Sequence, residues 1–312
     1  MADIINRADA AALIPTEYSA EIIQGAIQQS IALSLFTRLA DMGTNVREMP
    51  VLSTLPFVYF PGGDTGMKKA SSVSWEKKSI VAEELAVIFP IPKNVLNDAK
   101  YDIIGQIKPL LIQSFGQAID AAIFFGVNKP ALWPDDIVTM AGAAGNTLID
   151  TGNIYDDTLG EDGIYTLVEQ DGFDVNGAIS AISMKAVLRG LKDTTGRPLY
   201  DMGIPKEGGT PFILGDAPLY FARNGVWDDA KAKLIVGDMT QAVYAMRQDI
   251  TYDIFDSGVI QDTDNSIKYN LIQQDMIALR AVMRLGWQVP NPINAMNADK
   301  NTRCPFAALI PS

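Results

Sequence analysis

Apolar side chains recur at helical spacing near the start of the chain. Residues 16–40 follow Pro15, and Thr16 suits the N-cap position of a helix. Two apolar stripes follow at mainly four-residue spacing: Ile23, Ile27, Ile31, Leu35 and Leu39, and Ile22, Ala26, Leu33 and Phe36. Because two stripes offer more apolar surface than one contact covers, we expect this N-terminal arm to lie between neighbours and to pack against other subunits.

A second helical pattern covers residues 94–125. Pro92 suits the first turn of a helix. Apolar side chains then recur every three or four residues: Leu96, Ala99, Ile103, Ile107, Leu111, Phe115, Ala118 and Ala122. At the rise of an α-helix this spine is about 48 Å long. Pro109 removes one backbone donor, so we expect a bend there.

Strand patterns separate these two segments. Residues 46–60 and 73–89 read as strands, and the odd positions of the second include Val73, Trp75, Val81, Leu85, Val87 and Phe89. The turn-rich residues 61–66 lie between them. The result is a long hairpin, and because a lone hairpin is marginally stable in water, it should lie on something else.

The second half of the chain has shorter elements. Residues 128–177 are rich in Gly and Asp and read mainly as loops with short elements. An α/β pattern follows, with a helix at 183–191, a turn at 196–198, strands at 212–214, 234–236, 243–246 and 251–255, and a strand or helix at 277–285. The patterns indicate an α+β fold without an internal repeat.

The composition removes most catalytic chemistry. The 312 residues contain no His and one Cys, Cys304. Imidazole-based catalysis, HExxH zinc sites, cysteine clusters and intrachain disulfides are therefore excluded. The net charge of −12 argues against tight nucleic-acid binding. We identify no membrane-spanning run and no secretory signal, so we expect folding in a cytoplasm, with no cofactor and no metal.

Three polar motifs have structural explanations that we favour. Ser74 and Lys77 match the SxxK spacing of hydrolases, but positions three apart on a strand face opposite sides. The acidic groups at 156–162 and 262–265 do not fit an EF-hand loop and read as solvated turns. The run at 62–69, GGDTGMKK, lacks the Ser or Thr of a P-loop and reads as a basic hairpin tip.

Several segments, in this order, resemble the major capsid proteins of tailed bacteriophages. They are residues 14–22 (IPTEYSAEI), 90–99 (PIPKNVLNDA), 119–126 (IDAAIFFG), 213–216 (ILGD), 235–238 (IVGD) and 274–287 (QDMIALRAVMRLGW). The resemblance covers nearly the whole chain. It implies the Hong Kong phage capsid fold, with an N-terminal arm at 1–44 and an extended loop at 45–90. A peripheral domain at 91–127 and 245–288 would hold the spine helix, and an axial domain would cover 128–244 and 289–312.

The resemblance also implies a function without enzymatic activity. The chain would self-assemble into pentamers and hexamers of an icosahedral virion capsid, built in the host bacterial cytoplasm around double-stranded DNA that is enclosed but not specifically bound. Intersubunit contacts are expected from Ile23, Ile27 and Ile31 of the arm and from Lys68, Lys69 and Trp75 of the loop. The expected partners are other copies of the chain, a separate scaffold protein, a portal and decoration proteins. No contact with a membrane is expected.

Two features differ from some members of that family. We expect the arm helix to begin near Thr16, which would leave no room for a long N-terminal scaffolding region. Lys68, Lys69, Lys77 and Lys78 lie where some members form an isopeptide cross-link, but no partner Asn can be identified, so the bond is not predicted. The alternatives are an encapsulin-type nanocompartment shell, which shares the fold and encloses cargo proteins, and a carboxylate-based hydrolase using residues 156–162.

Overall fold

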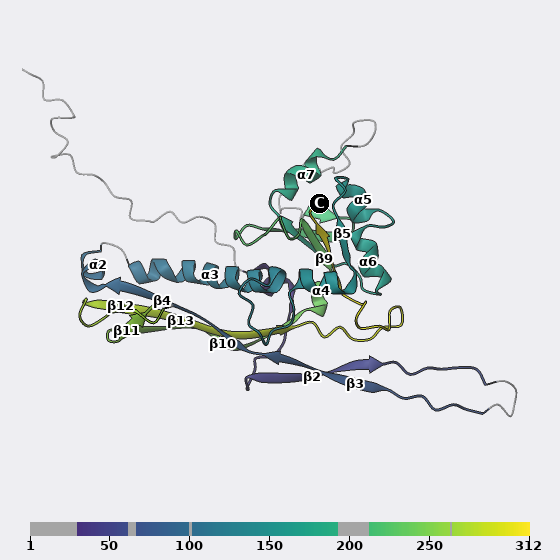
Figure 1. Ribbon diagram of the computed structural model, residues 1–312, viewed down its shortest axis with the longest axis horizontal. Coiled ribbons are helices and arrows are strands. Elements are labelled where there is room, and N and C mark those ends of the chain that lie inside the picture. The colour runs from purple at the N-terminus through teal and green to yellow at the C-terminus, as the bar shows by residue number, and fades with distance from the viewer. Residues whose placement is uncertain (1–29, 62–66, 100–101, 193–211, 263) are drawn as a thin grey trace, which may run out of the picture.

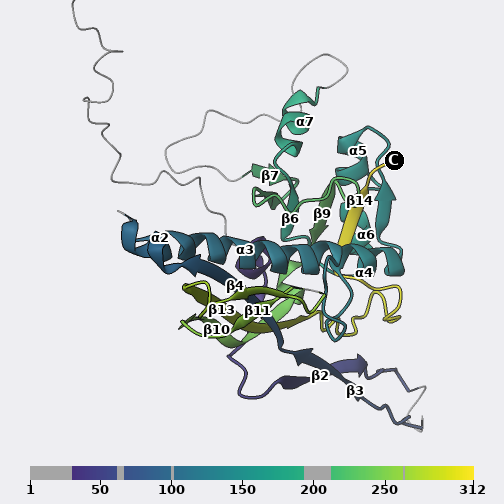
Figure 2. The ribbon, with the colours of Figure 1, turned by 60° about the vertical axis from the view of Figure 1, so that its left-hand side comes forward.

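The computed structural model describes residues 30–61, 67–99, 102–192, 212–262 and 264–312. It is a mixed α+β structure in which a long helix lies along a four-stranded sheet (Figure 1). A six-stranded sheet with its own helices stands on the other side of the long helix, and a two-stranded hairpin extends away from both (Figures 1 and 2).

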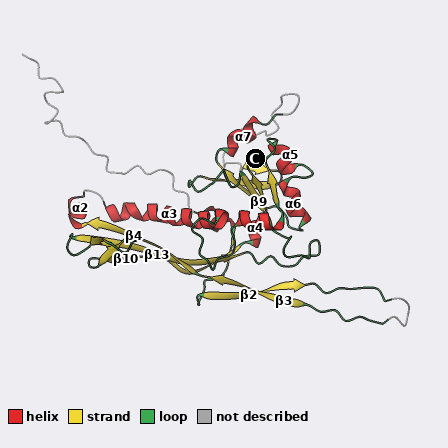
Figure 3. Ribbon diagram, in the orientation of Figure 1, coloured by secondary structure: helices red, strands yellow, loops and turns green. Residues whose placement is uncertain are grey.

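The helices are mostly short. They are α1 (Ile31–Leu35), α2 (Lys93–Asp98), α3 (Ile103–Phe125), α4 (Ile137–Ala144), α5 (Ile154–Leu159), α6 (Ile164–Gln170), α7 (Met184–Gly190) and the 3₁₀ turn η1 (Met239–Gln241). Figure 3 shows them beside the strands. None of the helices in the described residues has the length and apolar character needed to span a lipid bilayer.

The strands form four sheets. They are β1 (Thr37–Arg38), β2 (Val46–Thr54), β3 (Ser74–Val81), β4 (Glu83–Pro92), β5 (Thr147–Ile149), β6 (Gly177–Ala181), β7 (Phe212–Leu214), β8 (Ala217–Ala222), β9 (Leu234–Gly237), β10 (Val243–Phe255), β11 (Val259–Gln261), β12 (Ile267–Asn270), β13 (Met276–Gln288) and β14 (Phe306–Ile310). Their orders are β1-β10-β13-β4, β11-β12, β5-β14-β9-β6-β8-β7 and β2-β3.

The spine helix is shorter than predicted. Ala99 is extended and ends α2, so the pattern at 94–125 is divided between two helices. The carboxylate of Asp102 caps α3 by accepting from the Gly105 N–H, and Gly126 ends it with a left-handed φ of 66°. The 23 residues of α3 span about 35 Å. Pro109 lies inside α3, and the bend expected there stays a prediction.

The four-stranded sheet packs its core against α3. Val243–Phe255 form one strand, and not two as predicted, because register shifts between Met246, Gln248 and Thr251 let β10 stay paired with β13. The segment predicted as strand or helix at 277–285 is strand β13. Trp287 of β13 is fully buried and stacks with Phe36 at 6.2 Å between ring centroids.

The six-stranded sheet is covered on both faces. Ile179, Ile235 and Phe306 pack on the side of α3 and α4. Leu219, Leu234 and Leu309 pack on the side of α5, α6 and α7, against residues that include Ile164, Val168 and Leu188. The predicted α7, β7 and β9 are confirmed. Strands β6, β8 and β14 were not predicted.

The predicted strand at 73–89 is two strands in two sheets. β3 pairs with β2, whereas β4 pairs with β13. The chain changes sheets at Ala82, which is buried and whose N–H donates to the carbonyl of Asn45 at 2.9 Å. Strand β2 also ends at Thr54, before the predicted residue 60.

The predicted helix at 16–40 lies largely outside the described residues, and so does the turn at 196–198. The described part corrects its end. Helix α1 stops at Leu35, and Thr37–Arg38 pair in parallel with Val243 and Tyr244. The N–H of Leu39 continues this contact by donating to the carbonyl of Tyr244 at 2.8 Å, so the backbone gains a sheet neighbour instead of further helical turns.

Candidate assembly surfaces

The β2–β3 hairpin and its extension expose large apolar side chains. They are Val46, Leu55, Phe57, Val58, Phe60, Met67, Val73 and Trp75. Phe60 is fully exposed, and Trp75 is 65% exposed. Apolar side chains gathered in this way on a projecting element mark an interaction surface in a folded chain.

The two faces of β3 have opposite surroundings. Ile80 is fully buried, and Glu76 and Lys78 on the same face are half-buried. The other face carries Trp75 and Lys77, which are exposed. The inner face therefore meets the rest of the chain, and the apolar Trp75 lies on the outer face.

A small core joins the base of the hairpin to the four-stranded sheet. Ile80 and Ala82 pack with Met42, Val243 and Ala245. Gly286 of β13 lies so close that a Cβ there would stand 2.3 Å from the carbonyl oxygen of Val81. This contact requires glycine because the obstacle is backbone.

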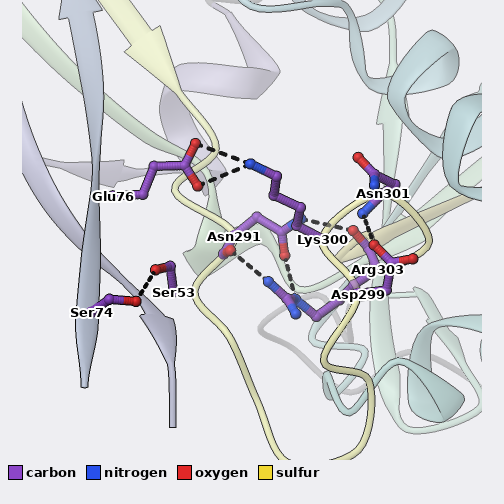
Figure 4. Close-up of polar contacts among 8 residues, drawn as sticks. All are labelled: Ser53, Ser74, Glu76, Asn291, Asp299, Lys300, Asn301 and Arg303. Atoms are coloured by element: carbon purple, nitrogen blue, oxygen red, sulfur yellow. Dashed lines mark hydrogen bonds and ion pairs between the residues drawn. The ribbon is translucent and has the colours of Figure 1, made fainter. Parts of the chain in front are cut away.

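A segment at 289–305 forms a second attachment (Figure 4). The ammonium of Lys300 lies 3.2 Å from both carboxylate oxygens of Glu76 in β3. The N–H of Ile293 donates to the carbonyl of Leu52 in β2 at 3.1 Å. The hairpin thus rests on two separate parts of the body.

Arg303 holds that segment in shape. Its buried guanidinium donates from Nε to Asn291 Oδ1 at 2.9 Å, and from its other nitrogens to the carbonyls of Asn297 and Asn291. Burial lowers the pKa of Arg303, and the charges of Asp171 and Asp299 oppose that shift. Figure 4 shows this guanidinium beside Asn291 and Lys300.

The start of α1 is fastened to the spine through Asp120. This buried carboxylate of α3 accepts from the Ser30 hydroxyl at 2.5 Å and from the N–H groups of Ile31 and Ala32 at 2.9 and 3.1 Å. Asn224 adds a fourth donor at 2.7 Å. Burial raises the pKa of Asp120, and these hydrogen bonds oppose that shift. The contact holds the first residues of α1 against α3.

The predicted contact residues have different surroundings. Ile23 and Ile27 lie outside the described residues. Ile31 is 4% exposed and packs in its own chain's core beside α3. Lys68, Lys69 and Trp75 are exposed on the hairpin, where the Lys69 ammonium lies 5.6 Å from the Tyr59 ring centre. The structure therefore leaves the three hairpin residues open to a neighbour and encloses Ile31.

The polar motifs take part in local structure. Ser74 bonds to Ser53 and Thr54, while Lys77 pairs with Glu48 at 2.7 Å. Asp157 is buried, and its carboxylate accepts from the N–H and hydroxyl of Thr151. Asp262 pairs with Lys268. Within the described ranges, no three acidic or cysteine side chains gather closely enough to hold a metal ion.

Two parts of the attachment were missed from the sequence. Asp120 lies within a helical pattern, and the spacing of the apolar residues there does not indicate that this carboxylate is buried. The segment at 289–305 did carry a signal, because Asn291, Asn294, Asn297 and Asn301 recur every three or four residues. Asparagine amides commonly build such side-chain-to-backbone networks.

Known proteins with similar sequences identify the family of this chain. The model of the phage capsid family matches residues 10–297. The major capsid protein of Staphylococcus phage 80alpha is 24% identical over 298 residues, which are 92% of this chain and 85% of that protein.

Two solved structures are similar over almost the full chain. A structure from Microbacterium phage Oxtober96 has a TM-score of 0.86 and 35% identity, covering 99% of this chain and 100% of the other. One from Mycobacterium phage Adephagia has a TM-score of 0.84 and 30% identity, covering 100% and 99%. The chain therefore belongs to the phage capsid family, as a structural major capsid protein and not an enzyme.

Proposed function

We propose that this major capsid protein assembles into pentamers and hexamers, which close into an icosahedral shell around double-stranded DNA. The supporting observation is the hairpin, whose Phe57, Val58, Phe60 and Trp75 are left exposed by their own chain. A second copy that covers them removes apolar surface from water, and repetition of one heterologous contact builds a ring. Shell assembly is the activity that such an uncovered element supports best.

The proposal divides the chain by its contacts. The hairpin is the extended loop, for which we now favour residues 45–81 over 45–90, because β4 pairs with β13. Residues 91–127 and 245–288 form the peripheral domain with α3, joined by β4. Residues 128–244 and 289–312 form the axial domain, in agreement with the pairing of β14 with β9. The scaffold, portal and decoration partners stay predictions of the resemblance.

Deleting residues 61–72 tests the role of the hairpin. The monomer should keep its fold, because this segment lies beyond the paired part of β2 and β3. Closed shells should not form, since the deletion removes the exposed Met67, Lys68 and Lys69, which within the described part of the chain touch only the hairpin and are open to a neighbouring copy. Light scattering and negative-stain electron microscopy on wild type and deletion measure both outcomes, and normal shells from the deletion would contradict the proposal.

The contents of purified particles separate the two shell functions. Double-stranded DNA inside particles recovered from infected cells supports the virion capsid. Protein cargo in place of DNA would support the encapsulin-type shell instead. Nuclease protection followed by gel electrophoresis makes this measurement.

A further inference from the structure

Two adjoining cavities border the 289–305 segment, one of them facing the hairpin and the other facing α4 and the loop before it. Their volumes are about 240 and 520 Å³. Lys78, Asn291, Lys300, Asn301 and Arg303 line both, so they form one cleft, which we name the hairpin cleft. Figure 4 shows Lys300 reaching Glu76 on β3, with Asn291 and Arg303 beside it.

The hairpin cleft is positively charged in an acidic protein. Each cavity is lined by the three cations Lys78, Lys300 and Arg303 and by one carboxylate, Glu76 or Asp135. Glu76 is engaged by Lys300, and Asp135 by Lys129 at 2.9 Å. The chain as a whole carries −12. This local reversal of sign fits an acidic group.

Lys78 is the cation available to such a group. Its ammonium has no hydrogen bond or ion pair within the described part of the chain, although the side chain is half-buried. The neighbouring Lys77 points to the other face of β3 and pairs with Glu48. Arg303 is 3% exposed, and its hydrogen bonds go to neutral oxygens. A carboxylate entering the cleft would meet the free ammonium of Lys78, with the positive charges of Lys300 and Arg303 nearby.

We propose that the hairpin cleft binds an acidic side chain of a second copy of this chain. The proposal rests on the assembly function proposed above. Charge complementarity supplies the occupant: residues 131–184 contain ten acidic residues and no Lys or Arg, and Asp156, Glu161 and Asp162 among them are exposed. Because Lys78 belongs to the hairpin and Lys300 and Arg303 to the body, the bound carboxylate also ties these two parts together.

Zero-length cross-linking tests the contact. Chains with natural nitrogen and chains labelled with ¹⁵N are mixed before assembly, and the particles are treated with a carbodiimide, which joins an amine to a carboxylate that touches it. Mass spectrometry should find Lys78 joined to an Asp or Glu in peptides that combine both labels. Lys77 should link to Glu48 within one chain. Lys78 links confined to single chains, or absent from particles, would overturn the proposal.

A matched pair of variants tests the consequence. Lys78→Gln should raise the protein concentration needed for half-maximal assembly by about tenfold. Lys77→Gln, one residue away on the outer face, should change it by less than about twofold. Both variants should unfold at the wild-type temperature, which shows that folding is intact.

The outcomes separate the two proposals. Equal assembly by wild type and both variants would overturn the carboxylate site and leave the assembly function standing. A wild type that assembles neither alone nor when coexpressed with its scaffold protein would overturn both. The monomer could instead bind inorganic phosphate, with binding abolished in Lys78→Gln and no cross-link between subunits. That result would overturn the proposed occupant, because the cleft would then bind a free ion and not a neighbouring copy.

Discussion

The body and the hairpin of this subunit use similar residues in opposite ways. In the body, Trp287 is fully buried between a sheet and a helix of the same chain. In the hairpin, Trp75 lies on a strand whose outer face no described part of the chain covers. The body therefore obtains its hydrophobic stabilisation when it folds, whereas the hairpin obtains part of it when it meets another molecule.

The base of the hairpin, where the two regions join, is buried like the core of the body. Ile80 is completely buried at the base of the hairpin, and Gly286 brings β13 against the backbone of Val81. The hairpin is thus firmly rooted although its outer half is uncovered. A rooted but uncovered element can present the same surface in every subunit, which an ordered shell requires.

Removing the buried indole should have the largest effect on stability. Trp287→Ala deletes a side chain that stacks with Phe36, and the cavity should lower the free energy of unfolding by about 3–5 kcal/mol. Urea denaturation of the monomer measures the loss. A change below about 1 kcal/mol would show that the body does not depend on this core.

Blocking the joint should have the next largest effect. The methyl group of Gly286→Ala would stand 2.3 Å from the Val81 carbonyl, so the hairpin base must shift, at a cost of about 1–3 kcal/mol. Gly43→Ala is the matched control, because nothing lies within 4 Å of the added Cβ. Equal midpoints for both variants in urea would contradict the close approach.

Cys304 should give the body a dependence on alkaline pH. Burial raises the pKa of this thiol to about 12, whereas the unfolded chain has a thiol pKa of about 8.5. Between these values the folded state holds the proton more tightly, so stability falls as pH rises, by about 1 kcal/mol per pH unit. Urea denaturation at pH 8, 9 and 10 should show this slope, and Cys304→Ala should lack that part of it. Identical slopes would contradict the buried thiol.

Local patterns predicted many elements but not the places where the chain changes partners. Apolar spacing and Gly punctuation identified α7, β7 and β9. The same spacing ran unbroken through Ala82 and Ala99, where one strand becomes two and one helix becomes two. The break at Ala82 depends on a contact distant in sequence, between its N–H and the carbonyl of Asn45, and periodicity within a segment contains no information about such a contact.

The candidate surface was predicted as an element, though not in its orientation. Alternation along residues 73–89 indicates two faces, and it does not say which one meets the body. The charged Glu76 and Lys78 lie inside and Trp75 outside, because the inner neighbours are polar residues of the 289–305 segment. An ordinary surface strand turns its large apolar side chains inward, and the exposed Trp75 is the exception to that rule in β3.

Trp75→Ala should have the smallest effect on the stability of the monomer. It is the direct counterpart of Trp287→Ala, because it removes the same kind of side chain from the hairpin instead of the body. With 65% of the side chain exposed, its loss should change the free energy of unfolding by less than about 0.5 kcal/mol. Shell yield at fixed protein concentration should nevertheless fall, because the indole becomes buried only between copies, and buried tryptophans commonly dominate interfaces. Urea denaturation and electron microscopy on the same preparation give the two readings. A destabilised monomer would show that Trp75, like Trp287, stabilises its own chain. Shells at the wild-type yield would show that Trp75 contributes nothing to the contact with a neighbouring copy.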